Sequence, residues 1–555
     1  MKLATTIAVI LLFHTLTFSA TIYVPDDHST IQGAIDAAVN GDKIIVRQGN
    51  YLENINFLGK AITVISETGP SATVIDGGQN GSVVTFESRE GATSRIVGFT
   101  LKNGFAMSGG GILCSYASPI IADNVITNNV SDFHGGGIFC EYSAAVITGN
   151  TITDNEADFY GSGIYCYSYA SPTITENEIS YNHADGFAGG IYCSSGSSPT
   201  ISENVFTHNT CYDGGGGIFC DGPAIISSNT FIENISYEDG GGVKCSNNAS
   251  PTITGNHFVN NEASRDGGAI CGGGCVMTVT NNIMAGNWAR FQGGGYATGW
   301  STTATLTNNT IVGNTTDLEG GGIHCSEKSD LTVSNTILWN NHAPEGPEIW
   351  IGNGAFPSTL TISHCDLDGG QASIYLDSGC TLNMGAGMID ADPLFVDPAN
   401  GDYHLFFHSP CSDAGDASAP GLPSEDFEGD PRSASNGVDV GADEFYFHLY
   451  SLGEVIPGNV ITIRVTGQPD MATELFLGPG VRDPAMPTIY GDFYVKAPVT
   501  SFYFGRTAAN GVIDHQATVP PTWQSGNECA GQALVGSISW PSSRLTNLIV
   551  LTVVE

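Results

Sequence analysis

Residues 135–166 read GGGIFCEYSAAVITGNTITDNEADFYGSGIYC, which is one complete repeat and the start of the next. A glycine run leads into a short apolar segment that ends in a cysteine, and a six-residue segment bounded by Asn150 and Asn155 follows. The glycine motif occurs nine times between Gly109 and Cys325. Successive cysteines are 25 to 27 residues apart, with Thr298 in one of their places. A constant period of this length is typical of a solenoid of stacked repeats.

Each repeat contains three short alternating runs, for example Thr173–Thr175, Glu178–Ser180 and Gly190–Cys193. Asn, Gly and Asp separate these runs, a pattern that favours strands and turns over helices. Three strands and three turns close one coil, and coils then stack as parallel strands. A leucine-rich repeat would need recurrent leucines, and a calcium-binding roll has a much shorter period. The sequence therefore predicts an all-β fold, a single-stranded parallel β-helix of about 12–15 coils with three strands per coil.

Strand alternation predicts which side chains lie inside the coil. In GGGIFC, Ile138 and Cys140 should point inward and Phe139 outward. The first Asn of each six-residue segment is expected at a turn, because Asn tolerates a left-handed backbone, and the stacked asparagines should form a structural ladder. A second inward ladder is expected at Ile126, Ile152, Ile179, Phe206, Phe231 and Phe258.

The chain divides into four predicted segments. Residues 1–20 are expected to be a signal peptide, with Lys2 before a short apolar run and small residues at its end. Residues 21–390 should form the β-helix, and an amphipathic cap helix near residues 30–40 should cover the open edge of its first coil. Residues 391–445 are rich in Asp, Pro and Gly and are expected to be a closing segment or linker. Residues 446–555 are expected to form a small C-terminal β-sandwich.

The charge of the chain excludes some partners. Seventeen basic and 56 acidic residues give a formal net charge of −39. Such a charge repels nucleic acid and anionic membrane surfaces. No apolar run after the signal peptide reaches the ~20 residues of a transmembrane helix. We therefore expect a secreted or cell-surface monomer that binds no nucleic acid and has no transmembrane segment after signal cleavage.

A row of aromatic residues alternates with the inward positions of the repeats. Phe139, Tyr165, Tyr192 and Phe219 precede successive cysteines and should point outward. A row of exposed rings would form a sugar-stacking or adhesive surface, since a flat ring covers the apolar face of a pyranose. These four residues are the predicted substrate-binding residues. The alternative is that the closing segment or the C-terminal domain lies over the row.

Two groups of charged residues are candidates for further chemistry. Asp132, Asp158 and Asp185 each lie eight residues before a cysteine and should stack, so they could bind calcium or be ordinary solvated turn acids. Calcium is the one cofactor suggested, and none is required. Lys244, Arg265 and Asp266 lie near one another on successive coils and are the candidate catalytic residues. The alternative for this cluster is a surface salt-bridge group.

The cysteine column leaves three alternatives open. Fourteen cysteines in an exported protein suggest disulfides. Inward cysteines one above another can equally pack as buried thiols, because in-register neighbours have unfavourable Cβ directions for a disulfide. Metal binding is the third alternative, although the chain lacks a CxxC motif.

Three stretches resemble known families. The opening TIYVPDDHSTIQGAIDAAVNGDKIIVRQGNYLENI, with KAITVIS and TVIDGG, resembles the cap and first coils of pectin lyase-like right-handed β-helix proteins. The GGGI motif with FTHN, FIEN and FVNN is similar to the repeats of polymorphic outer-membrane protein adhesins. DADPLFVDPANGDYHLFFHSPCSDAGDAS and VDVGADEF are similar to the closing segment of bacterial surface β-helix proteins with varied C-terminal anchors. These resemblances imply a right-handed β-helix over residues 21–445.

Two functions are compatible with this fold. The first is a non-catalytic protein that binds a polysaccharide, a cell-surface glycan or a surface protein through its aromatic face. The alternative is a polysaccharide lyase or glycoside hydrolase, in which calcium could neutralise the substrate. The scarcity of basic residues in the repeats favours the first.

Overall fold

The computed structural model describes residues 19–352, 356–406, 409–432 and 437–445, and the backbone of the strands between residues 449 and 552. Most of the expected signal peptide thus lies outside the described residues. The chain divides into two compact units. Unit 1 comprises the residues up to Thr252 together with Phe258–Met277 and Trp288–Phe291. Unit 2 comprises Ile253–His257, Thr278–Asn287 and Gln292–Glu555.

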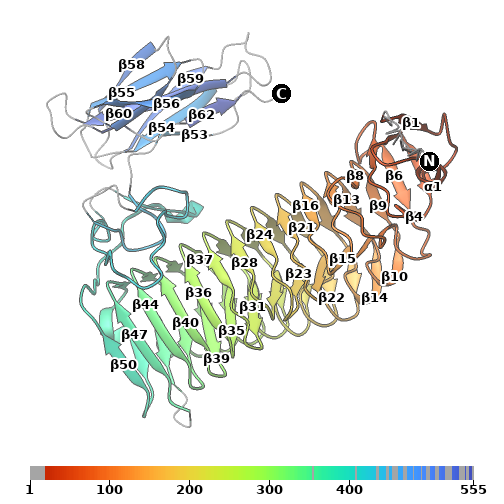
Figure 1. Cartoon of the computed structure of the whole chain (residues 1–555). Helices are drawn as coiled ribbons and strands as arrows, with labels where there is room; N and C mark the ends of the chain where they lie inside the picture. Colours follow the sequence, from red (N-terminus) through yellow and green to blue (C-terminus); the bar gives the residue numbers. More distant parts are fainter. Residues whose placement is uncertain are drawn as a thin grey trace, which may run out of the picture. The chain divides into compact units, whose positions relative to one another are not determined.

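Unit 1 begins with strand β1 (Thr21–Val24), helix α1 (Ile31–Ala37) and strand β2 (Lys43–Val46) (Figure 1). The Thr30 hydroxyl caps the helix by accepting a hydrogen bond from the Gly33 N–H at 3.1 Å. The Glu53 carboxylate accepts the N–H groups of Ile31 and Gln32, both at 2.9 Å. The predicted cap helix is confirmed, but it ends earlier than expected, and Val39 is 53% exposed.

From β8 (Arg95–Val97) onward, each coil of unit 1 contains four strands, whereas the first two coils contain three. One coil contributes β12 (Ile120–Ala122) to sheet 1, β13 (Val125–Thr127) to sheet 2, β14 (Val130–His134) to sheet 4 and β15 (Ile138–Glu141) to sheet 3. Each pairs in parallel with the equivalent strand of the next coil, for example Ile126 with Ile152. Sheets 1 to 3 contain the three strands that the sequence predicted for each coil. Sheet 4 was not predicted, because its strands shorten to two residues in the following coils.

The inward ladders form the core of unit 1. Ile126, Ile152, Ile179, Phe206, Phe231 and Phe258 are all fully buried, as predicted. The phenylalanine rings stack, with centroids 4.7 Å apart between Phe206 and Phe231 and 4.7 Å apart between Phe231 and Phe258. Each coil therefore adds one apolar layer, and the layers pack directly on one another.

Two asparagine ladders link the coils, one from each end of the six-residue segment. Asn182 shows the pattern: its N–H and Nδ2 both donate to Asn209 Oδ1, and its Nδ2 also donates to Ile152 O. Its own Oδ1 accepts from Asn155. The predicted ladder from the first Asn is confirmed. The left-handed residue, however, is the one before the ladder Asn, for example Asp123 (φ 55°) before Asn124.

The cysteine column is buried and is interrupted by a shift of register. Six cysteines align in register and are fully buried: Cys114, Cys140, Cys166, Cys193, Cys220 and Cys245. They are thiols. Cys271 was expected in the same column, but it pairs with Lys244, and Gly272 pairs with Cys245. Cys271 is four residues after Gly267, whereas Cys245 is five residues after Gly240, so the motif GGAIC is one residue shorter than GGGVKC and Cys271 lies on the outer side of the sheet.

Unit 2 continues with coils of the same kind. Its sheet 3 strands are β39 (Tyr296–Gly299), β43 (Ile323–Cys325), β46 (Ile349–Ile351) and β49 (Ile374–Leu376). Its sheet 2 strands include β41 (Thr310–Val312) and β45 (Ile337–Trp339), which pair in parallel. The two units together contain about 14 coils, in agreement with the predicted number.

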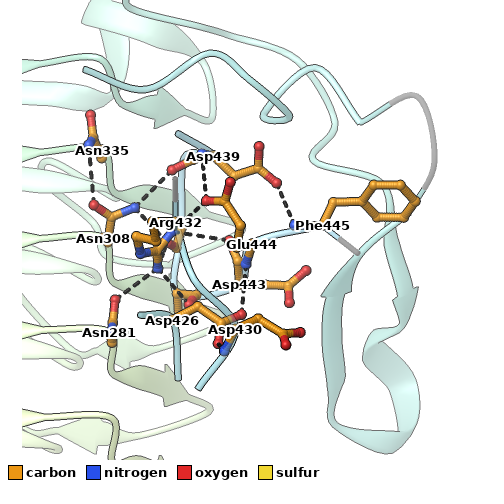
Figure 2. Close-up of polar contacts among 12 residues, drawn as sticks. Asn281, Asn308, Asn335, Asp426, Asp430, Arg432, Asp439, Asp443, Glu444 and Phe445 are labelled. Atoms are coloured by element: carbon orange, nitrogen blue, oxygen red, sulfur yellow. Dashed lines mark hydrogen bonds and ion pairs between the residues drawn. The ribbon is translucent and has the colours of Figure 1, made fainter. Parts of the chain in front are cut away.

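The closing segment packs on the outer side of the unit 2 coils (Figure 2). Arg432 is 2% exposed, and its Nη2 donates to Asn281 Oδ1 at 2.8 Å and to Ala442 O at 2.7 Å. Its Nη1 lies 3.2 Å from Glu444 Oε2. Asn308 Nδ2 donates to Asp439 O at 2.8 Å. These contacts join residues 391–445 to side chains of the coil turns, so the segment is not an open linker.

The C-terminal strands are antiparallel. β53 (Leu449–Leu452), β54 (Val460–Thr466) and β59 (Val512–Thr518) form one sheet. A second contains β58 (Thr500–Arg506), β55 (Ala472–Gly478), β60 (Glu528–Gly536), β61 (Arg544–Leu545) and β62 (Ile549–Thr552). β56 (Val481–Thr488) and β57 (Gly491–Val495) form a hairpin. The described strands agree with the predicted change from parallel coils to a small β-domain.

Candidate binding face and charged clusters

Sheet 3 of unit 1 carries the predicted aromatic row. Its strands here are β11 (Ile112–Ser115), β15, β19 (Ile164–Tyr167), β23 (Ile191–Cys193), β27 (Ile218–Cys220) and β31 (Val243–Ser246). Phe139, Tyr165, Tyr192 and Phe219 occupy the same position on successive strands and pair in register. The outward row therefore exists where the sequence predicted it.

The row is covered, so the prediction of an exposed platform at these four residues is wrong. Phe139, Tyr165, Tyr192 and Phe219 are only 7%, 4%, 8% and 4% exposed. The turn that precedes each strand folds back over the sheet and places Tyr160 and Phe187 on the row. The Tyr160 and Tyr192 ring centroids are 4.9 Å apart, and those of Phe187 and Phe219 are 4.7 Å apart. The cover consists of local turn residues, and the four rings form a second apolar layer outside the coil.

The exposed rings lie in the turn that follows sheet 3. Tyr116, Tyr142 and Tyr169 occupy this turn on three successive coils and are 57%, 41% and 73% exposed. The ring centroids are 4.6 Å apart between Tyr116 and Tyr142 and 5.7 Å apart between Tyr142 and Tyr169. We call these three residues the tyrosine stack. The sequence signal for it was available, because each tyrosine follows its cysteine by two or three residues.

The backbone of the tyrosine stack is in an unfavourable conformation. Tyr116, Tyr142 and Tyr169 have φ values of 53°, 47° and 60°. A bulky residue in this left-handed region costs roughly 1–2 kcal/mol, and Gly or Asn would relieve that cost. Three large aromatic residues at the position where a small residue would fold better point to a role of their side chains beyond folding.

One end of the tyrosine stack has an open ring face. Gly196 occupies the corresponding turn of the next coil, and an added Cβ there would lie 3.5 Å from the Tyr169 nitrogen. No side chain of that position therefore covers Tyr169. Tyr167 is 42% exposed and lies in register with Glu141, which accepts a hydrogen bond from the Ser115 hydroxyl at 3.0 Å. The surface thus combines flat rings with a carboxylate and hydroxyl groups.

More exposed rings lie in the turn before sheet 3. Phe133 and Phe159 stack with centroids 5.6 Å apart and are 41% and 46% exposed. Tyr212 and Tyr237 follow on later coils, with centroids 5.2 Å apart. Exposed aromatic residues therefore lie along both edges of sheet 3 in unit 1.

The acidic column is present without a metal-binding arrangement. Asp132, Asp158 and Asp185 align because their neighbours pair in register from coil to coil. Asp158 and Asp185 are exposed, and His183 Nε2 lies 3.2 Å from Asp185 Oδ1. Among the residues that the structure describes, no group of three or more His, Cys, Asp or Glu side chains could hold a metal ion. Asp132 is half-buried while Asp158 and Asp185 are exposed, and the three carboxylates do not form the cluster that the predicted calcium site would need.

The candidate catalytic cluster is a network of ion pairs. Lys244 Nζ lies 2.7 Å from Asp239 Oδ2 and 3.1 Å from Cys271 Sγ, and the lysine is 9% exposed. Burial by itself would lower the pKa of Lys244, but contact with Cys271 and Asp239 outweighs burial and raises it. Arg265 pairs with Glu238 at 2.7 Å. A lysine held in its charged form is a poor general base.

Asp266 interacts electrostatically with Arg265 and so belongs to this network. The pKa of Arg265 is raised chiefly by its hydrogen bond to Glu238. The three candidate residues Lys244, Arg265 and Asp266 are therefore brought together in unit 1. Their arrangement is that of the salt-bridge alternative rather than that of an acid–base pair.

Comparisons with known proteins address the fold. The family model for a right handed beta helix region matches residues 110–283 and 260–385. A solved complex of XylC with xylose is 10% identical, with 94% of this chain and 96% of that chain covered and a TM-score of 0.35. The enzymatically active domain of bacteriophage CBA120 tailspike protein 4 is 13% identical, with 92% of this chain and 64% of that chain covered and a TM-score of 0.17. No curated protein matches the chain.

The resemblance to polymorphic outer-membrane protein adhesins is not tested by these matches and stays a prediction. The described part of the chain contains no helix that is long and apolar enough to cross a membrane.

The matched family region coincides with the parallel coils in both units. The sequence match and the coils together identify the chain as a pectin lyase-like right-handed β-helix protein.

Proposed function

We propose that this protein is exported and binds glycans through the exposed aromatic surface of unit 1, without cleaving them. The observation that carries the proposal is the tyrosine stack, in which Tyr116, Tyr142 and Tyr169 are exposed, stacked and held in a left-handed backbone conformation. Flat rings beside hydroxyl and carboxylate groups suit a sugar, which has an apolar face and a polar rim.

The electrostatics restrict the class of glycan. The chain carries a formal net charge of −39, and Glu141 lies on the strand next to Tyr167. An anionic polysaccharide would be repelled by this surface unless cations screened it. The proposed ligand is therefore a neutral glycan.

Binding rather than cleavage is supported by the state of the charged cluster. Lys244 is buried against Asp239, and its raised pKa opposes a role as a base. The buried phenols of Tyr165 and Tyr192 have pKa values raised mainly by burial, so both stay protonated. These groups therefore offer no base for proton abstraction at neutral pH.

The test replaces Tyr142 and Tyr169 by Ala and measures binding on a glycan array and in gels that contain neutral polysaccharides. Each ring contributes ~0.5–1.5 kcal/mol, so losing two should weaken binding by a factor between about 5 and about 150. Tyr181→Ala is the matched control, because Tyr181 is 56% exposed, has a φ of 55° and stacks on His208 at 4.8 Å in a different turn.

Two results would contradict the proposal. If the double variant binds every glycan as tightly as the wild type, the tyrosine stack is not the binding surface. If the wild type releases new reducing ends or unsaturated products from a glycan, the protein is an enzyme. Loss of these products in a Lys244 or Arg265 variant would then locate the catalytic site.

A further inference from the structure

An open pocket of about 500 Å³ lies in unit 2, between the outer side of the coils and the closing segment. Val312 and Trp339 line it from the strands β41 and β45. Its other wall contains Leu394, Phe395 and Phe406 of the closing segment. This volume falls within the ~300–1,000 Å³ that is usual for small-molecule sites. The pocket is separate from the tyrosine stack, which belongs to unit 1.

Both walls are fixed by packing. Trp339 is the last residue of β45 and lies in register with Val312. On the opposite wall, β51 (Phe395–Asp397) pairs antiparallel with β52 (Asp402–Leu405). Trp339 and Phe395 pack against one apolar cluster that contains Val312 and Ala442. The two aromatic side chains are therefore positioned before any ligand enters.

Two polar side chains complete the lining. Asp392 Oδ1 accepts a hydrogen bond from the Leu394 N–H at 2.9 Å, which orients the carboxylate. No partner of its Oδ2 is found in the described part of the chain. Asn340 contributes an exposed side-chain amide, and its backbone N–H donates to Asp368 Oδ2 at 3.2 Å. A carboxylate that accepts and an amide that both donates and accepts match the hydroxyl groups of a sugar.

The backbone at the pocket is strained. Leu394 has a φ of 55°, a left-handed conformation that is unfavourable for a bulky side chain. Unlike the turn residues of the coils, Leu394 does not belong to a repeated position. Strained residues of this kind gather at ligand-binding sites, where the surrounding structure holds them in place.

We propose that this pocket binds a single neutral pyranose. Trp339 supplies a ring face for the apolar side of the sugar, and Asp392 and Asn340 bind its hydroxyl groups. The lining residues that the structure describes include no Lys, Arg or His, and the Asp392 and Asp368 carboxylates disfavour a uronate or a sulfated sugar. This inference rests on the proposal that the protein recognises glycans and adds a second site, in unit 2.

The experiment titrates the full chain with methyl β-D-glucopyranoside, methyl β-D-galactopyranoside and methyl β-D-xylopyranoside. Tryptophan fluorescence and saturation-transfer NMR measure the binding. At least one neutral glycoside should bind saturably, and D-glucuronate should bind at least tenfold more weakly. Trp339→Ala should abolish saturable binding. Trp300→Ala is the matched control, because Trp300 is 74% exposed in the turn between β39 and β40 (Thr303–Thr307) and lies outside the pocket.

A second variant covers the case in which Trp339→Ala fails to fold. Asp392 is exposed, so the Asp392→Asn variant should fold normally. It should bind neutral glycosides several-fold more weakly and discriminate less against D-glucuronate. The proposal is overturned if no neutral glycoside binds saturably, or if D-glucuronate binds as well as the neutral sugars. It is also overturned if choline, which suits aromatic walls, binds more tightly than any glycoside.

The two proposals fail in different ways. Tyr142→Ala with Tyr169→Ala should weaken polysaccharide binding and leave glycoside binding in the pocket unchanged. If the tyrosine variants have no effect on polysaccharides while Trp339→Ala removes glycoside binding, the pocket stands and the tyrosine stack does not. If the tyrosine variants weaken polysaccharide binding while Trp339→Ala leaves glycoside binding unchanged, the pocket proposal is wrong and the tyrosine stack stands.

Discussion

Tyr169 shows the cost of placing a large side chain at a turn that prefers glycine. Its φ is 60°, and its side chain is 73% exposed, so it makes few stabilising contacts. We expect Tyr169→Gly to be more stable than Tyr169→Ala by about 1 kcal/mol, because only glycine adopts this conformation without strain. Thermal unfolding of the two variants measures the difference.

Tyr167 provides the control for this comparison. It is exposed to 42% but lies in the strand β19, where the backbone is extended. At this position the Gly variant should be less stable than the Ala variant, because glycine loses more backbone entropy on folding. The same order of stability at both positions would show that the left-handed backbone of Tyr169 carries no strain.

Cys193 illustrates a thiol made inert by its position. Hydrogen bonds to Cys166 and Cys220, together with burial, raise the pKa of Cys193 well above its usual value. The thiolate is the reactive form, so we expect Cys166 and Cys193 to resist bulky maleimides in the folded protein and to react after unfolding. Mass spectrometry of labelled peptides measures this. Rapid labelling without denaturant would contradict the buried column.

The asparagine ladders act at the scale of the coil. Asn182 bonds to both neighbouring coils through Asn155, Asn209 and Ile152 O. We expect Asn182→Ala to lower the free energy of unfolding by at least about 2 kcal/mol, because it leaves several buried polar groups without partners. Asn128→Ala is the control, since Asn128 is exposed in the turn beside the ladder and, within the described part of the chain, its side chain bonds only to Thr127. Denaturant unfolding measures the free energy of unfolding of both variants. An equal loss in Asn182→Ala and Asn128→Ala would show that the ladder adds no stability.

The sheet 3 strands show why alternation predicted direction but not exposure. Ile164 and Cys166 point inward and Tyr165 outward, as the period of two requires. Whether an outward ring contacts water depends on the conformation of the preceding turn, which places Tyr160 over it. Turn conformation is set by several φ and ψ angles and by neighbouring coils, so the pattern of one strand does not contain it.

At the scale of the molecule, the closing segment of unit 2 should be sensitive to alkaline pH. His404 lies between Asp402 at 2.6 Å and Glu428 at 3.1 Å. Burial alone would lower its pKa, but these two carboxylates raise the pKa of His404 to about 11. Burial raises the pKa of Asp443 to about 8. Both groups therefore bind a proton more tightly in the folded protein than in the unfolded chain.

The sign of the pH effect follows from this difference. A group whose folded pKa is raised loses its contribution to stability as the pH rises from its unfolded pKa to its folded pKa. For Asp443 this window runs from ~4 to about 8, and for His404 from ~6.5 to about 11. Cleavage of residues 391–445 by a protease should accelerate between pH 6 and pH 9, after correction for the protease's own pH dependence.

The variant His404→Gln tests the assignment, because it cannot titrate in this range. Its cleavage rate should be higher than that of the wild type at pH 6 and should change less between pH 6 and pH 9. A wild-type rate that is constant across this range, or an unchanged pH dependence in the variant, would show that His404 does not hold the closing segment in place.

The sequence by itself determined the coil, its period, its inward ladders and the position of the aromatic row. This was possible because a β-helix is held together by contacts between equivalent positions of successive repeats, and those repeats are visible as a period. The antiparallel C-terminal strands were also predictable from their longer apolar runs.

Only the tertiary structure decided which rings are exposed, where Cys271 points and where the closing segment lies. Tyr165 is covered by a turn, and Cys271 moves outward through one missing residue in its repeat. Arg432 binds Asn281, from which it is separated by 151 residues. The contact of Arg432 follows no period, because it arises from packing between distant parts of the chain, and the cover over Tyr165 depends on turn angles that the pattern of a repeat does not encode.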